Sequence, residues 1–241
     1  MKTINLKICF LVLFIFLTTI LAFAQKQPTS GARISFSETV WDFGYVPKTG
    51  TVSHTYIIKN TGSDTLIIVK VRPDCGCTTT PMTQKRLSPN ESAEMKIFFD
   101  PRKVVTNEAV KKLQIISNDP DNPISEAQFV AKIGITSSLV KLSPTEFNFD
   151  TLVLGAEGSR TITVENISKE QLSINAIEGP VEYVDYSIGK KVIKPGESIQ
   201  LVAKLKKGVA SGNFHTSLTI EFEGSKVARI SIPIFGEIVS Q

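Results

Sequence analysis

The chain has 241 residues, of which 41% are hydrophobic, 21% charged and 8% aromatic, a composition typical of a folded globular protein and not of a disordered one. Without residues 1–24, it has 25 basic and 23 acidic side chains, a net charge of about +2. So small a charge excludes a strongly electrostatic nucleic-acid binder. Two histidines and three cysteines are too few for a multi-site metalloenzyme or a disulfide-rich miniprotein.

Residues 1–24 have the pattern of a secretory signal peptide. Lys2 and Lys7 precede an apolar run at 8–23, and Ala22-Phe23-Ala24 matches a small-x-small cleavage site. An uncleaved anchor is the alternative, since this run of 16 residues approaches the roughly 20 that span a bilayer. We predict cleavage before Gln25, no transmembrane segment in the mature chain, and a periplasmic or extracellular location, where cysteines close in sequence tend to pair.

A repeat with a constant offset of 106 residues follows a short polar segment at 25–32. Residues 34–71 align with 140–177 without a gap. Matching residues include Phe43 and Phe149, Thr55 and Thr161, and Asn60 and Asn166. Two copies of about 105 residues match the usual size of a domain. We predict domains at 33–136 and 137–241, joined by a linker too short for free tumbling.

Each copy is predicted to be β throughout, because runs of four to eight residues rich in Val, Ile, Thr and Phe alternate with Gly, Asn, Asp and Pro. Apolar and polar residues alternate at 92–99 and again at 198–205, as in half-buried antiparallel strands. About seven short strands per copy, with turns every 8–12 residues, indicate a sandwich. The predicted fold class is therefore all-β, with two tandem immunoglobulin-like β-sandwich domains after an N-terminal signal peptide.

Four motifs occur in order in the first copy. They are Trp41-Asp42-Phe43-Gly44, Asn60-Thr61-Gly62, Asp74-Cys75-Gly76-Cys77-Thr78 and Ser117-Asn118-Asp119-Pro120-Asp121-Asn122-Pro123. Together they resemble the secreted bacterial family called domain of unknown function 1573, within the wider group of immunoglobulin-like domains related to HYDIN, the ASPM/SPD-2 modules and the major sperm protein. The resemblance covers residues 34 to about 135, whereas the second copy keeps only the sandwich skeleton, with Val181 and Tyr183 at the cysteine positions. It implies the fold and export, and no known reaction.

Cys75-Gly76-Cys77 is the motif with the most chemical potential. In an extended strand, the two Cα atoms would lie roughly 6.6–6.8 Å apart, at the edge of what a disulfide tolerates, and Gly76 permits a tighter turn. Closing so small a loop stabilises the fold by only about 1.6 kcal/mol on entropic grounds. Four interpretations stay open: a local disulfide that pins a loop, a redox-active pair, a soft-metal site for Cu(I) that adds Met82 or His54, and pairing with another chain.

Other candidate positions give weaker signals. Asp119, Asp121 and Asn122 lie in a loop that is longer than its counterpart in the second copy, so we consider them candidate contacts with a partner. Two prolines interrupt the spacing that a calcium loop needs, and Asx turns explain this segment better. His54 and His215 have no second histidine at ligand spacing and are expected to be half-exposed strand residues.

These patterns predict no enzyme, no cofactor and no metal site. We expect a secreted or periplasmic non-enzymatic structural or interaction protein that binds a protein or cell-envelope partner through loops or edge strands. No nucleic-acid partner is predicted, and the partner itself is unknown from the sequence. The alternative is a thiol-redox or copper-handling protein centred on Cys75 and Cys77.

Overall fold

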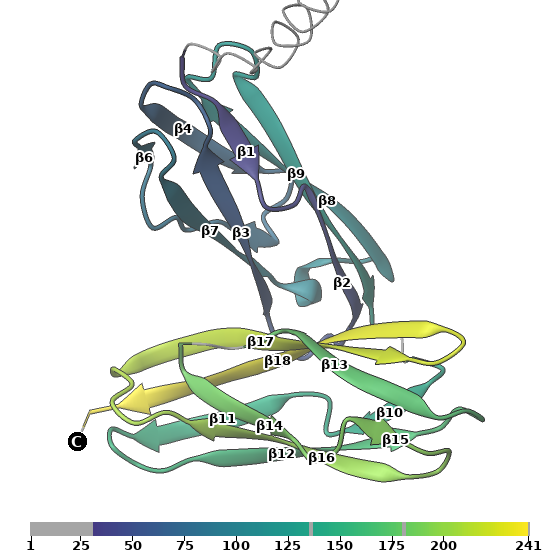
Figure 1. Cartoon of the computed structure of the whole chain (residues 1–241). Helices are drawn as coiled ribbons and strands as arrows, with labels where there is room; N and C mark the ends of the chain where they lie inside the picture. Colours follow the sequence, from purple (N-terminus) through teal and green to yellow (C-terminus); the bar gives the residue numbers. More distant parts are fainter. Residues whose placement is uncertain (1–30, 135–136, 180–181, 241) are drawn as a thin grey trace, which may run out of the picture.

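The computed structural model describes residues 31–134, 137–179 and 182–240, and shows two β-sandwiches in series (Figure 1). The predicted signal peptide, 1–24, lies outside the described residues. Among the residues described, no helix has the length and apolar character needed to cross a membrane.

The first sandwich packs a sheet in the order β1-β3-β7-β5 against a sheet in the order β2-β9-β8-β4-β6. The strands are β1 (Ile34–Phe36), β2 (Val40–Val46), β3 (Val52–Asn60), β4 (Leu66–Pro73), β5 (Thr78–Thr79), β6 (Arg86–Leu87), β7 (Ser92–Phe99), β8 (Glu108–Ser117) and β9 (Ile124–Ile133). One turn of 3-10 helix, Pro101–Lys103, follows β7. Phe43, Phe99 and Phe129 are fully buried between the sheets, where their rings pack edge to face or tilted.

The second sandwich repeats this plan, with a sheet in the order β10-β12-β16-β14 facing β15-β13-β17-β18, and β11 parallel to β18. The strands are β10 (Val140–Ser143), β11 (Phe147–Val153), β12 (Ser159–Asn166), β13 (Leu172–Glu178), β14 (Val184–Ile188), β15 (Val192–Ile193), β16 (Ser198–Leu205), β17 (Gly212–Glu223) and β18 (Val227–Val239). The predicted tandem immunoglobulin-like fold is confirmed. Each sandwich has nine strands, more than the expected seven or so, because the sequence pattern does not show pairings as short as those of β5, β6 and β15.

The repeat extends to the hydrogen bonds of one buried side chain. Asn60 and Asn166 are both fully buried at the end of equivalent strands. The Asn60 amide donates to the carbonyls of Asp64 and Leu87 at 2.8 and 2.9 Å. The Asn166 amide donates to the carbonyls of Glu170 and Ile193 at 2.8 and 3.1 Å. Both acceptors lie 106 residues after their counterparts, so each asparagine ties the same three segments of its sandwich together.

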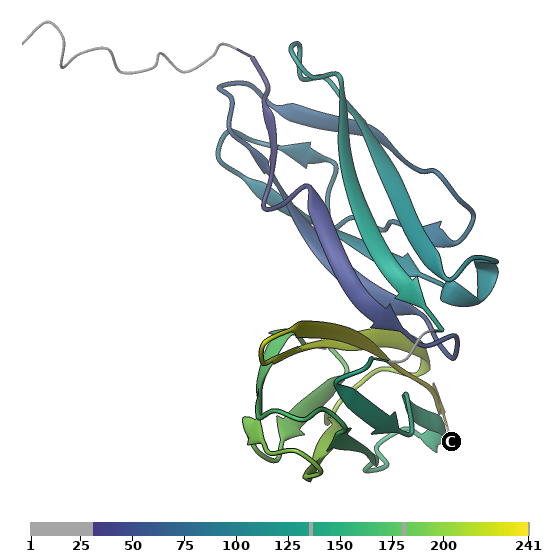
Figure 2. The same cartoon turned by 90° about the vertical axis from the view of Figure 1, so that its right-hand side faces the viewer.

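The side of the second sandwich formed by β17 and β18 lies against the end of the first sandwich that holds β2 and β3, and the two long axes cross (Figures 1 and 2). The strands β2 and β18 meet in parallel through the single pair Tyr45 and Ile230. This region, formed by β2, β3, β13, β17 and β18, is called the joint below.

Candidate functional site

The disulfide loop crosses from one sheet of the first sandwich to the other, between the end of β4 and the start of β5. Main-chain hydrogen bonds hold both of its ends, because Asp74 N donates to Lys112 O at 3.0 Å and Asp100 N donates to Cys77 O at 2.9 Å. A disulfide joins Cys75 and Cys77, whose Cα atoms are 5.2 Å apart. This distance is shorter than that of an extended strand because the chain turns at Gly76, and it lies within the ordinary range for disulfides.

The two sulfur atoms differ in their access to solvent. Cys77 is only 6% exposed and belongs to the core of the first sandwich, whereas Cys75 is partly exposed. The hydroxyl of the buried Thr78 lies beside the disulfide, with Oγ1 3.5 Å from the Cys75 sulfur and 3.8 Å from the Cys77 sulfur. A reagent in solvent therefore meets Cys75 first.

A shallow cavity of about 470 Å3 opens over the disulfide. Its lining consists of Cys75, Gly76, Cys77, Lys103, Val104, Val105, Thr106 and Lys111. Among the described residues, neither Lys103 nor Lys111 has an ion-pair partner within 4.0 Å, and Val105 is 96% exposed. The nearby Asp74 carboxylate accepts a hydrogen bond from Lys112 N at 3.0 Å. The cavity thus combines a disulfide with two ammonium groups and an exposed apolar side chain; we call it the disulfide groove.

Of the two further ligands considered for Cu(I), His54 is engaged elsewhere. Both ring nitrogens of His54 face carboxylates in the joint, and Met82 is partly buried against the core of the first sandwich. No group of three or more His, Cys, Asp or Glu side chains in the described part of the chain is close enough to hold a metal ion. With their sulfurs joined in a disulfide, the two cysteines present no pair of free thiolates to a metal in this structure.

The Asp119 carboxylate organises the loop that the sequence analysis singled out. Asp119 is 1% exposed and accepts hydrogen bonds from the main-chain N–H groups of Ile34, Asp121 and Asn122 at 2.9, 2.9 and 3.1 Å, and from the Arg33 guanidinium at 3.1 Å. Burial alone would raise the pKa of Asp119, but these hydrogen bonds hold it below its ordinary value. Asp119 thus fastens β1 to the loop, and of the three candidate contact residues only Asp121 and Asn122 are exposed.

His54 is not half-exposed, as the sequence analysis expected; it is 4% exposed because the second sandwich covers it. Its ring stacks on Trp41 with centroids 3.8 Å apart. Its Nδ1 lies 2.8 Å from Glu178 Oε2, and its Nε2 lies 3.2 Å from Glu38 Oε1 without hydrogen-bond geometry. His54 therefore belongs to the joint and holds the sandwiches together.

Side chains of the second sandwich also form hydrogen bonds with main-chain N–H and C=O groups of β2 and β3. Ser217 Oγ accepts from Ser53 N and donates to Ser53 O, both at 3.0 Å. Glu178 Oε1 accepts from Thr55 N at 3.1 Å, and Ser231 Oγ donates to Phe43 O at 2.8 Å. An unpaired strand edge would otherwise be open to other chains. The joint therefore closes these edges.

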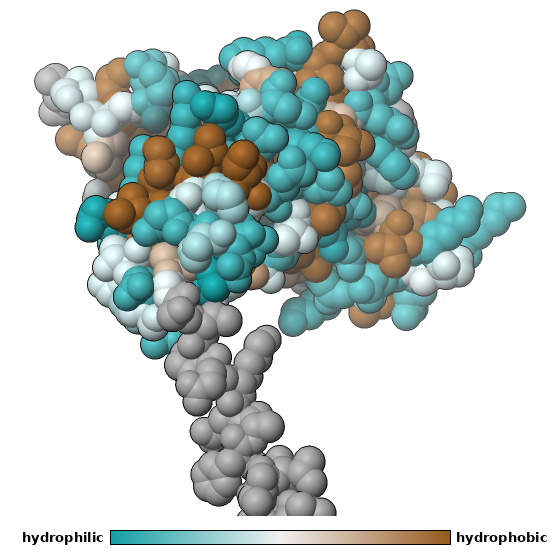
Figure 3. Space-filling model, turned by 90° about the horizontal axis from the view of Figure 1, so that it is seen from above, coloured by the Kyte–Doolittle hydropathy of each residue, from teal (hydrophilic) through white to brown (hydrophobic). Residues whose placement is uncertain are grey.

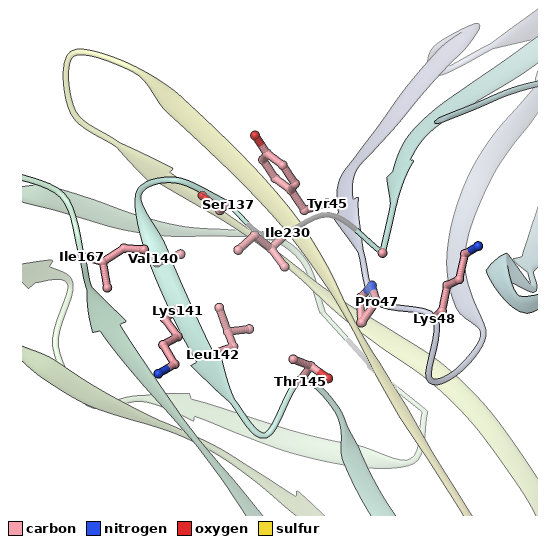
Figure 4. A pocket seen from close by; sticks show the side chains of 11 residues that line it. Tyr45, Pro47, Lys48, Ser137, Val140, Lys141, Leu142, Thr145, Ile167 and Ile230 are labelled. Atoms are coloured by element: carbon pink, nitrogen blue, oxygen red, sulfur yellow. The ribbon is translucent and has the colours of Figure 1, made fainter. Parts of the chain in front are cut away.

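An apolar cavity of about 670 Å3, which we call the joint pocket, lies where the sandwiches meet (Figure 4). Its lining consists of Tyr45, Pro47, Lys48, Gly134, Ser137, Val140, Lys141, Leu142, Thr145, Ile167 and Ile230. The side chains of Lys48 and Lys141 stand at opposite ends, with their ammonium groups directed outwards (Figure 4). Sequence reasoning missed this pocket, because its residues come from both repeats and share no motif.

A family model described as a protein of unknown function, DUF1573, matches residues 34–132 and again 140–238. The chain belongs to the DUF1573 family. The sequence motifs covered only the first of these matches, so the expectation that the second copy keeps only the sandwich skeleton is corrected: it is a second DUF1573 repeat. The family description carries no activity, and no curated protein matches the chain.

Solved structures similar to this DUF1573 protein have low sequence identity to it and low TM-scores. A Porphyromonas gingivalis W83 protein of unknown function is 14% identical, with 85% of this chain and 99% of that chain covered and a TM-score of 0.34. The YadV chaperone is 14% identical, with 84% and 98% covered and a TM-score of 0.34. The ASH / PapD-like domain 7 of human CEP192 is 10% identical, with 44% and 92% covered and a TM-score of 0.36. At these values the likeness carries no argument.

Proposed function

We propose that this chain is an exported, non-enzymatic binding protein that contacts a protein partner at the joint pocket. The observation that supports this most directly is the apolar lining of a pocket of about 670 Å3 between two domains. Ligand and partner sites favour such concave places at domain interfaces, and volumes of about 300–1,000 Å3 are typical of them.

The chemistry of the lining indicates the chemistry of the partner. Tyr45, Leu142 and Ile167 supply partly exposed apolar surface, and Ile167 is 47% exposed. Covering such surface is favourable by about 25 cal/mol per Å2. Lys48 and Lys141 at the two ends favour carboxylates. The proposed occupant is therefore an apolar side chain of a partner protein that is flanked by acidic residues.

Site-specific crosslinking tests the proposal in the native host. A photoreactive benzoylphenylalanine at Ile167 is expected to capture a discrete partner protein, whereas the same residue at Ile124 captures none. Ile124 is a matched control, because it is also an exposed isoleucine, 57% exposed, and it lies at the end of β9 that is distant from the joint.

A second variant separates loss of binding from loss of folding. The substitution Leu142→Glu, added to the chain with the photoreactive residue, places a charge in the pocket and is expected to abolish the crosslink while the circular dichroism spectrum is unchanged. The same partner captured equally from Ile167 and Ile124, or a crosslink that Leu142→Glu does not weaken, would refute a binding site at the joint pocket.

A further inference from the structure

We propose that the Cys75–Cys77 disulfide is a thiol-exchange site, at which a cysteine in an acidic peptide segment attacks Cys75 and is captured as a mixed disulfide. The proposal is independent of the joint pocket. It is supported by three features of the disulfide groove: the unequal exposure of the two sulfurs, the two lysines, and the Thr78 hydroxyl beside the disulfide.

Access determines which sulfur is attacked. Cys75 is partly exposed beneath the open groove, whereas Cys77 is 6% exposed. The peptide thiolate forms a bond with Cys75 Sγ, and the bond between the Cys75 and Cys77 sulfurs breaks. The electron pair leaves with Cys77 as a thiolate, and the proton of the incoming thiol goes to solvent. The exchange consumes one disulfide and forms one, so it requires no other oxidant.

Thr78 lies where the leaving thiolate needs a hydrogen-bond donor. The Thr78 hydroxyl is 3.8 Å from Cys77 Sγ. Because Thr78 is only 5% exposed, water competes little with the sulfur for a hydrogen bond to this hydroxyl. In the second repeat, where the cysteine positions are Val181 and Tyr183, the residue equivalent to Thr78 is Val184, which is buried in the core. The hydroxyl is thus present in the repeat that has the disulfide and absent from the repeat that lacks it.

The groove also indicates which thiol it accepts. Lys103 and Lys111 line it, and both lack an ion-pair partner within 4.0 Å among the residues that the structure describes. Asp100, which Lys103 also faces, is already held by Arg102 at 2.8 Å. Two ammonium groups that form no ion pair within 4.0 Å raise the local concentration of anionic reactants and favour a thiolate. The exposed Val105 adds an apolar contact. The expected substrate is a cysteine with acidic neighbours.

The first test locates the mixed disulfide. In a Cys9→Ala background, Cys75 and Cys77 are the only cysteines. The oxidised chain is incubated with an Asp-Cys-Glu peptide, quenched with acid and mapped by mass spectrometry. We expect the adduct on Cys75. We also expect the single thiol of a Cys77→Ser variant to react with the oxidised peptide at least about tenfold faster than that of a Cys75→Ser variant. Equal reactivity, or a disulfide that excess peptide leaves intact, would overturn the proposal and leave a structural staple.

The second test distinguishes electrostatic selection of the substrate by the two lysines from a general effect of the substitutions on the fold. The double variant Lys103→Gln/Lys111→Gln is expected to slow exchange with Asp-Cys-Glu by at least about threefold at low salt and to leave exchange with Lys-Cys-Lys unslowed. The pair Lys191→Gln/Lys226→Gln, at exposed positions of the second sandwich, is the matched control and should slow neither. Thr78→Val is expected to slow both peptides alike. Equal slowing of both peptides by the Lys103/Lys111 variant refutes electrostatic selection of the substrate.

Discussion

Replacing Gly44 by alanine should separate the two sandwiches at the joint. Gly44 lies in a bulge of β2 with φ +64°, and a Cβ built on it would lie 2.0 Å from Arg229 O and 2.5 Å from Arg229 C. Both are main-chain atoms of β18, so no side-chain rotation relieves the contact. The equivalent residue of the second repeat is Asp150, also at positive φ, 53°. The repeat therefore tolerates a side chain in this conformation, and the glycine is needed because β18 approaches it.

The expected loss in the free energy of unfolding of Gly44→Ala has two parts. Alanine in a left-handed conformation costs about 1–2 kcal/mol. Moving β18 away from β2 also breaks the hydrogen bonds from Ser231 Oγ to Phe43 O, 2.8 Å, and from the Arg229 guanidinium to Asp42 O, 3.1 Å, each of which contributes about 1 kcal/mol. The sum is about 3–4 kcal/mol, and for a chain of this size it lowers the Tm by roughly 6–16 °C.

Gly196→Ala is the matched control, because Gly196 has φ +73° and no heavy atom lies within 4 Å of a Cβ built there. Gly196→Ala should lose only the cost of placing alanine in a left-handed conformation, about 1–2 kcal/mol of the free energy of unfolding. Chemical denaturation measures the free energy of unfolding, and small-angle X-ray scattering measures the separation of the sandwiches. If Gly44→Ala loses no more stability than Gly196→Ala and keeps the wild-type scattering profile, the close packing of β2 on β18 is refuted.

Further substitutions test the repeat, the acid response and the leader. Asn60→Ala and Asn166→Ala should each lose about 2–3 kcal/mol, measured by urea unfolding, because each removes the donor of two hydrogen bonds, one of them to the carbonyl of a buried residue, Leu87 or Ile193; a loss below about 0.5 kcal/mol contradicts their role. Since the pKa of Asp119 is lowered in the folded chain, its stabilisation is complete above the unfolded value of about 3.9 and is lost as the pH falls through the folded value. Asp119→Asn should therefore flatten the pH dependence of the Tm below about pH 5, and an unchanged profile would contradict this. The mass of the exported chain should correspond to an N-terminus at Gln25, lighter by two hydrogens than the reduced form; an intact leader would refute cleavage.

The repeat made most of the fold predictable. The offset of 106 residues places equivalent residues in equivalent environments, as Asn60 and Asn166 show, and the alternation in 92–99 and 198–205 marks the buried residues of β7 and β16. The two-residue strands β6 and β15 escaped prediction because so short a pairing leaves no periodic signal. Fold prediction thus succeeded where the pattern extends over many residues.

The disulfide motif was visible in the sequence, but its surroundings were not. Cys75 and Cys77 are close in the chain, so pairing could be considered from spacing alone. Lys103 and Lys111 follow at least 26 residues after Cys77, beyond the whole of β7, and only the packing of the two sheets brings them to the disulfide. The difference in exposure between the two sulfurs likewise depends on how the loop crosses between the sheets.

The joint was the part of the molecule least predictable from the sequence, because its contacts connect residues that are far apart in the chain, several of them through small hydroxyl groups. His54 and Glu178 are 124 residues apart. On β17, residues 216–220 are all buried, although alternation predicts that every second one faces solvent. The outward residues there are Ser217 and Thr219, whose side chains suit solvent and a polar interface equally well. Ser217 hydrogen bonds to the main chain of Ser53, and Thr219 to Ser231 at 2.9 Å. A polar interface of this kind resembles an exposed sheet face in sequence, and it becomes recognisable only when the acceptors on the other domain are in place.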